Sequence, residues 1–142
     1  MYFYNINSMS TSHPSEGMVN NFISSAAGTA GLNHGFKLSG ETSPSPGDLV
    51  AASVRDVNPA YPGLELEDGT EIVLKTGNIL IGVLGSRRAL HGFSGHVPKT
   101  LETGQSIHLL NKGGVIGECT AFNRSLEWPT SLEYLGTCLL YT

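Results

Sequence analysis

The sequence predicts a mostly β fold, a small antiparallel β-barrel or curled sandwich of about seven strands with one short N-terminal helix. Only 14% of the 142 residues are charged, and glycine is abundant, with 18 residues. Short apolar stretches recur at close spacing between turn-forming residues. Alternating strands and helices, which would require a parallel sheet, are not evident. The length is typical of one domain.

The N-terminal segment, residues 1–46, differs in composition from the rest. It carries only three charged residues and is rich in Ser, Gly, Asn and Thr, which predicts an arm. Ser15 is a suitable cap for a short helix over residues 16–27. At helical spacing, one face of that helix would hold Met18, Val19, Phe22 and Ile23. The Ser/Pro-rich stretch 43–47 then predicts an extended hinge before a β-barrel domain over residues 47–142.

Seven strands are expected in that second segment. Asp68-Gly69 is a strong hairpin signal between two of them, and Asn111 to Gly114 forms another turn. Gly82 lies inside the most apolar strand and marks a bulge or a close backbone approach. The expected strands span residues 48–57, 64–67, 70–75, 79–84, 106–110, 115–122 and 131–141. Residues 85–98 are expected to form an irregular loop.

The net charge and the hydropathy of the chain bear on which classes of function are possible. The net charge is −4, with eight basic and twelve acidic residues, which disfavours nucleic-acid binding. No apolar run is long enough to span a membrane. The N-terminus lacks the features of a signal peptide, so we expect a cytoplasmic protein. Cys119 and Cys138 lie in apolar stretches and are expected to be reduced and buried, with a disulfide between neighbouring strands as the alternative.

Several short motifs between residues 47 and 136 resemble a known arrangement. In order, they are Gly47-Asp48-Leu49-Val50, Leu64-Glu65-Leu66-Glu67-Asp68-Gly69, Leu84-Gly85-Ser86-Arg87, Phe93, Val97-Pro98, Gly113-Gly114-Val115-Ile116-Gly117, Pro129-Thr130 and Leu135-Gly136. This order resembles the amino-terminal β-domain of uncharacterised bacterial proteins that carry a nucleotide-binding-type region downstream. The resemblance implies an accessory domain and supplies no activity. The corresponding loop of those proteins is more acidic, whereas this chain has His91 and His96.

The loop 85–98 is the best candidate for a site, because it holds two Arg, two His and three Gly in fourteen residues. Guanidinium groups bind carboxylates or phosphates with two donors, and histidine transfers protons near neutral pH. With an aromatic wall from the C-terminal region, the candidate ligand-binding residues are Arg87, Arg88, His91, Phe93, His96 and Trp128. The alternative is a surface loop whose arginines pair with neighbouring carboxylates.

Three functions remain open. The first is an accessory domain that binds a small anionic ligand or a partner protein through loop 85–98. The second is a cofactor-free isomerase, cyclase or lyase, with His91 or His96 as acid or base. The third is an assembly module, because the charge-poor chain favours homo-oligomers, most often dimers. No cofactor motif is evident. No metal is expected, since only Glu102 and His108 lie near the two histidines.

Overall fold

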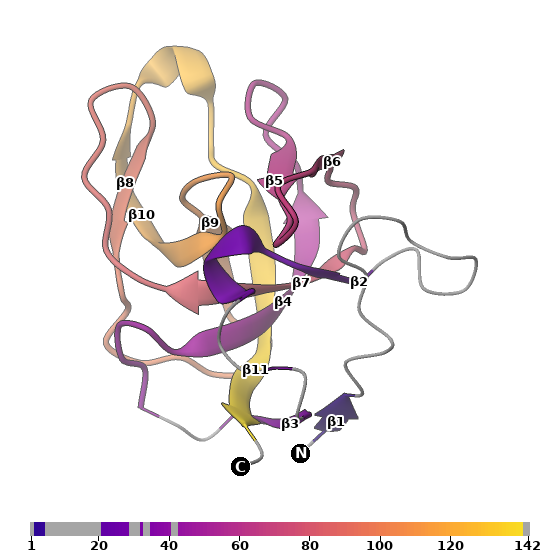
Figure 1. Ribbon diagram of the computed structural model, residues 1–142. Coiled ribbons are helices and arrows are strands. Elements are labelled where there is room, and N and C mark those ends of the chain that lie inside the picture. Colours follow the sequence, from indigo (N-terminus) through magenta and orange to yellow (C-terminus); the bar gives the residue numbers. More distant parts are fainter. Residues whose placement is uncertain (1, 5–20, 29–31, 33–34, 41–42, 141–142) are drawn as a thin grey trace.

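The computed structural model describes residues 2–4, 21–28, 32, 35–40 and 43–140 of the protein (Figure 1). The prediction of a mostly β fold is confirmed. In order, the strands are β1 Tyr2–Tyr4, β2 Asn21–Ile23, β3 Phe36–Ser39, β4 Leu49–Asp56, β5 Gly63–Glu65, β6 Glu71–Val73, β7 Ile79–Leu84, β8 Phe93–His96, β9 Ser106–Leu109, β10 Val115–Phe122 and β11 Ser131–Leu140. Short 3₁₀ turns lie at Ser25–Ala27 and Arg124–Leu126.

Nine of these strands form one sheet, in which the main path runs β1-β3-β11-β4-β7-β10-β8. β2 is attached to β7, and β9 pairs with both β10 and β11. Because β9 joins β10 to β11, the pairings β11-β4-β7-β10-β9 return to β11 and close a circuit of five strands. β5 and β6 form a separate two-stranded sheet at the upper right of Figure 1.

The prediction of a purely antiparallel arrangement is wrong at two pairings. β10 runs parallel to β7, with Val115 opposite Val83, and β2 runs parallel to β7, with Phe22 opposite Leu80. A parallel pair needs a long connection between its strands, and this is usually a helix. Here β8 and β9, rather than a helix, lie between β7 and β10 in the chain. The sequence therefore has no strand–helix alternation that would indicate the parallel pair.

The predicted helix over residues 16–27 is not formed in its described part. Residues 21–23 are strand β2, residues 25–27 are a 3₁₀ turn, and residues 16–20 lie outside the described residues. The reason is burial on two sides, since Phe22 packs in one core cluster and Ile23 in the other. Successive side chains point to opposite faces only in a strand. The backbone N–H of Ser24 continues the attachment to β7 by donating to the carbonyl of Ile81 at 3.0 Å.

The core consists of two hydrophobic clusters, to which the central strands contribute alternate residues. In β7, Leu80 and Leu84 belong to the first cluster, and Ile81 belongs to the second. The second cluster also contains residues from the N-terminal third of the chain, namely Ile23, Ala27, Leu32, Phe36 and Leu38. This N-terminal part therefore supplies both strands and core side chains to the sheet.

The turn and glycine predictions are confirmed where the structure tests them. Gly69 has a φ of 88° in the β5–β6 hairpin, a conformation that only glycine adopts readily. A Cβ atom on Gly82 would lie 2.5 Å from the carbonyl oxygen of Gly114, so this glycine marks a close approach between β7 and the turn before β10. The expected irregular loop 85–98 is only partly irregular. It contains β8, which pairs with β10 and makes an isolated bridge between Arg87 and Gly95.

Candidate functional site

Two hollows on the surface collect most of the candidate residues. The first, here called the Arg87 pocket, has a volume of about 680 Å³. Three segments form its walls, residues 60–63, residues 87–93 apart from Arg88, and the turn 109–112. The side chains that give it chemical character are Tyr61, Glu71, Arg87, His91, Phe93 and Lys112. Its remaining lining is largely apolar and includes Pro62, Leu90, Leu109 and Leu110.

Arg87 is held in place by its backbone and by its side chain. Its backbone exchanges two hydrogen bonds with Gly95, both of 2.9 Å. Its Nη1 donates to the carbonyl of Leu110 at 2.5 Å and to that of Phe93 at 3.5 Å. Within the described residues, no carboxylate lies within ion-pair distance of the half-buried guanidinium. Its positive charge is therefore fixed at the pocket wall without a neutralising partner in that part of the chain.

An ion pair also lines this pocket. The Nζ of Lys112 lies 2.6 Å from Oε1 of Glu71. The hydrogen bond that Lys112 donates to Glu71 and the negative charge of that carboxylate raise the pKa of Lys112. Both side chains are exposed, so the pair adds little to stability, but the two charges cancel at the rim. Arg87 is consequently the main source of net charge in the pocket.

The predicted site residues do not all come together. His91 is exposed and lines the Arg87 pocket beside Arg87 and Phe93. Arg88 is exposed and lines neither hollow. His96 also lies outside both, and its Nε2 is 3.5 Å from Oε2 of Glu118. His91 and His96 therefore do not line this pocket together.

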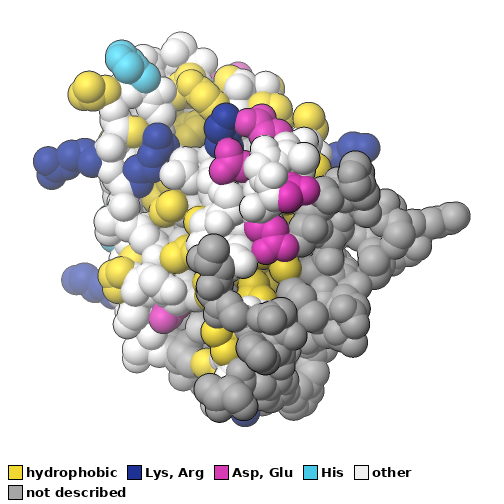
Figure 2. All heavy atoms as spheres, viewed as in Figure 1, with side chains coloured by type: hydrophobic (Ala, Val, Ile, Leu, Met, Phe, Trp, Pro, Cys, Tyr) yellow, Lys and Arg dark blue, Asp and Glu magenta, His cyan; other side chains and the backbone are white. Residues whose placement is uncertain are grey.

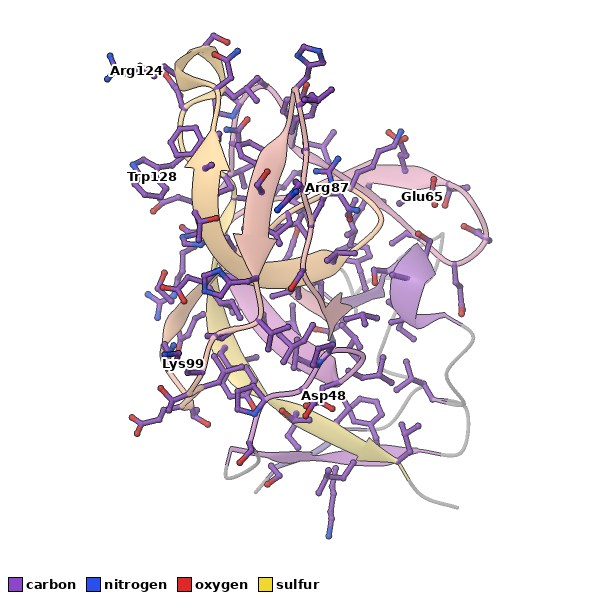
Figure 3. All side chains as sticks on the ribbon, turned by 90° about the vertical axis from the view of Figure 1, so that its left-hand side faces the viewer. Asp48, Glu65, Arg87, Lys99, Arg124 and Trp128 are labelled. Atoms are coloured by element: carbon purple, nitrogen blue, oxygen red, sulfur yellow. The ribbon has the colours of Figure 1, made fainter. Side chains whose placement is uncertain are left out.

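The second hollow, here called the Trp128 pocket, has a volume of about 620 Å³. Its polar and aromatic lining consists of Asp56, Asn58, His108, Phe122, Glu127, Trp128 and Ser131. Trp128 is 65% exposed. Its ring stacks on His108 at 5.9 Å between centroids and contacts Phe122 at 5.1 Å. Figure 3 shows Trp128 at the left edge and Arg87 nearer the middle, on opposite sides of β8 and β10 in this view.

A series of aromatic contacts joins the two pockets. Tyr61 meets Phe93 edge-on at 5.8 Å between centroids, Phe93 meets Phe122 at 6.1 Å, and Phe122 meets Trp128. Such contacts contribute about 0.5–1.5 kcal/mol each beyond burial. Tyr61 and Phe122 were not among the predicted site residues, because their positions in the sequence give no sign of this contact.

His108 is a further residue of the Trp128 pocket that the sequence did not predict as a binding residue. Its Nδ1 accepts a hydrogen bond from the backbone N–H of Cys119 at 3.0 Å. Burial lowers its pKa, and the nearby charge of Glu118 opposes that shift without reversing it. Both facts favour a neutral ring with its proton on Nε2.

The loops around both pockets are tied together by Asn58, which is 2% exposed. Its side-chain nitrogen donates to the carbonyls of Leu126 and Trp128, at 2.5 and 2.6 Å. Its side-chain oxygen accepts from the backbone N–H groups of Ala60 and Tyr61, at 2.8 and 2.9 Å. One buried amide thus positions a wall of each pocket.

Glu127 stands out among the described residues as the one non-glycine residue with positive φ. Its backbone has φ 60° and ψ −171°, a region that is essentially reserved for glycine. The carbonyls of the residues on either side, Leu126 and Trp128, are the two that Asn58 binds. The buried amide therefore holds the strained residue at the edge of the Trp128 pocket.

The acidic hairpin of β5 and β6 is a solvated surface. Glu67, Asp68 and Glu71 are exposed, and Glu65 is half-buried. Figure 2 shows acidic side chains gathered over the region of β5 and β6. The described residues contain no group of three or more His, Cys, Asp or Glu side chains suited to hold a metal ion. In the same part of the chain, no helix has the length and apolar character needed to cross a membrane.

Comparisons with known proteins add no identification. No protein-family model matches the chain. No curated protein and no solved structure matches it either. The resemblance to the amino-terminal β-domain of bacterial proteins therefore stays a prediction, and functional inference rests on the two pockets.

Proposed function

We propose that the protein is a small binding domain that takes an anionic ligand with an apolar body in the Arg87 pocket. The observation that carries the proposal is the half-buried guanidinium of Arg87, which has no carboxylate partner within the described residues. A charge that is partly removed from water favours an opposite charge beside it, and a carboxylate or phosphate group of a ligand would neutralise it through charge-assisted hydrogen bonds. The ring of Phe93 and the neighbouring leucines supply apolar contact for the rest of the ligand.

The way in which the fold holds the walls of the Arg87 pocket supports this proposal. The closed circuit of five paired strands is consistent with a small barrel, and segments that follow three of its strands form the pocket walls. The Arg87 side chain is itself anchored to the carbonyl of Leu110. A preformed pocket loses less conformational freedom when a ligand binds.

The test compares matched probes and matched variants. Benzoate and phenyl phosphate supply an anion on an apolar ring, and benzyl alcohol is a neutral control of similar size. Binding is measured by titration calorimetry and by thermal stabilisation. We expect both anions to bind at least about tenfold more tightly than benzyl alcohol.

Arg87→Gln keeps an amide donor but removes the charge, and should reduce anion binding by about tenfold or more. Arg87→Lys keeps the charge and should retain part of the binding. Arg88→Gln is the matched control, since Arg88 lines neither pocket. Equal binding of benzyl alcohol, or anion binding that survives Arg87→Gln, would overturn the proposal. Light scattering of the same samples tests the dimer expected from the charge-poor composition.

A further inference from the structure

The charges around the Trp128 pocket have the opposite sign to those of the Arg87 pocket. Asp56 and Glu127 contribute carboxylates to its lining, and no lysine or arginine of the described residues lines it. Arg55, next to Asp56 in the chain, is engaged in an ion pair with Glu133. The pocket is therefore negative, and it favours a positively charged occupant.

The aromatic surface of this pocket suits the same kind of occupant. Trp128 packs against Phe122 and His108, yet 65% of it remains exposed. The face of an indole ring attracts cations more strongly than that of any other side chain. His108 adds no opposing charge while its Nδ1 accepts the hydrogen bond from the backbone N–H of Cys119.

The backbone at Glu127 is a second, independent indication that this rim has a role beyond folding. Glycine would relieve the strain of its φ of 60° and ψ of −171°. The chain has glutamate there, and Asn58 clamps the carbonyls on both sides of it. Residues held in such conformations concentrate at ligand sites. What glutamate supplies and glycine lacks is a carboxylate at the edge of the pocket.

We propose that the Trp128 pocket binds a small organic cation that carries an alkylated ammonium group, such as the trimethylammonium group of choline. A trimethylammonium group spreads its charge over methyl groups that pack on Trp128 and Phe122, with Asp56 and Glu127 balancing the charge. A metal ion would instead need several converging ligands, and the described residues form no such group. The volume of about 620 Å³ lies within the usual range for small-molecule pockets.

Tryptophan fluorescence reports on this site alone, because Trp128 is the only tryptophan in the chain. Its intrinsic fluorescence is followed during titration with choline, with tetramethylammonium and with 3,3-dimethylbutan-1-ol, the neutral isostere of choline. We expect a saturable change with both cations. Choline should bind about tenfold more tightly than the neutral isostere, since only the cation gains the aromatic and carboxylate attraction.

Variants separate binding from folding. Asp56→Asn should weaken choline binding about fivefold. Glu127→Gly should also weaken binding, while it raises the melting temperature by relieving the backbone strain. A purely structural role for Glu127 predicts the stability gain without the binding loss. Trp128→Leu, followed by calorimetry, should abolish binding.

Two controls keep this proposal apart from the proposed function of the Arg87 pocket. Glu102→Gln removes an exposed carboxylate that lines neither pocket and should leave choline binding unchanged. Arg87→Gln should also leave it unchanged. The proposal is overturned if the isostere binds as tightly as choline, if Glu102→Gln weakens binding as much as Asp56→Asn, or if no saturable change occurs up to about 10 mM cation.

Discussion

The Nδ1 atom of His108 accepts a hydrogen bond from the backbone N–H of Cys119, at 3.0 Å, across the pair of strands β9 and β10. This bond exists only while Nδ1 is unprotonated. Burial lowers the pKa of His108 below the ordinary histidine value of 6.5. The unfolded chain therefore takes up a proton at a higher pH than the folded protein does.

The first prediction is a loss of stability in mild acid. The contribution of His108 is complete above the unfolded pKa of about 6.5 and is lost as the pH falls toward the lower folded value. His108→Asn places an amide oxygen near the position of Nδ1 and does not titrate. Urea unfolding between about pH 7 and pH 5 should show a steeper loss for the natural protein than for this variant. An equally steep loss of unfolding free energy in the two proteins would contradict the assignment of this pH dependence to His108.

The second prediction concerns Asn58, whose side chain ties two loops together. Asn58→Asp removes both amide donors and places a carboxylate against the carbonyls of Leu126 and Trp128. The free energy of unfolding should fall by about 3 kcal/mol. Trp128 fluorescence should change as well, because its loop loses its anchor.

Asn123→Ala is the matched control for this change. The side chain of Asn123 also accepts a backbone hydrogen bond in the same loop, from the N–H of Ser125, but it is exposed. Its loss should cost about 1 kcal/mol or less. Equal costs for the two variants would show that the burial of Asn58 is unimportant.

The third prediction is a stabilising substitution at Ser24. Its side chain is 0% exposed, and its Oγ has no hydrogen-bond partner among the described residues. Ser24→Ala should raise the free energy of unfolding by about 1 kcal/mol, because the unpaired hydroxyl no longer has to leave water. Denaturant unfolding measures the change.

The adjacent serine provides the control. Ser25 Oγ donates to the carbonyl of Gly113 at 3.2 Å. Ser25→Ala should therefore lower the free energy of unfolding by about 0.5–1 kcal/mol. We therefore expect the free energy of unfolding to rise for Ser24→Ala and to fall for Ser25→Ala. A destabilised Ser24→Ala variant would contradict this expectation.

The fourth prediction distinguishes the two cysteines, which are both free. Burial raises the pKa of Cys138 to about 12, and burial also raises that of the half-buried Cys119. Since the thiolate is the reactive form, Cys138 should resist a thiol reagent at about pH 8 until the protein unfolds. Cys119 should react slowly in the folded protein. The folded Cys119→Ser variant should show no reaction, and a reaction there would place Cys138 in contact with solvent.

The sequence predicted the strands whose signal is local. The apolar stretch of β7 and the strands around Asp68-Gly69 are recognisable from neighbouring residues alone. β1, β2, β3 and β8 were missed because partners far along the chain define them. Phe36, for example, pairs with Leu140. A three- or four-residue strand has too little periodicity of its own to outweigh a helical pattern such as that at residues 16–27.

The same distinction applies to the candidate site. Arg87, His91 and Phe93 share a pocket because one short segment carries them. Glu71 and Lys112 complete that pocket from two other hairpins, and no local pattern indicates that they approach it. The two pockets and the aromatic contacts between them are properties of the tertiary structure alone.

The position of β11 determines when this fold can form during synthesis. β11 lies between β3 and β4 and also pairs with β9, and all three partners precede it in the chain. Its pairing of Cys138 with Leu38 spans one hundred residues. A nascent chain on the ribosome therefore keeps β3, β4 and β9 without their shared neighbour until β11 has emerged. Such long-range pairing slows folding to the millisecond-to-second range and exposes strand edges to aggregation meanwhile.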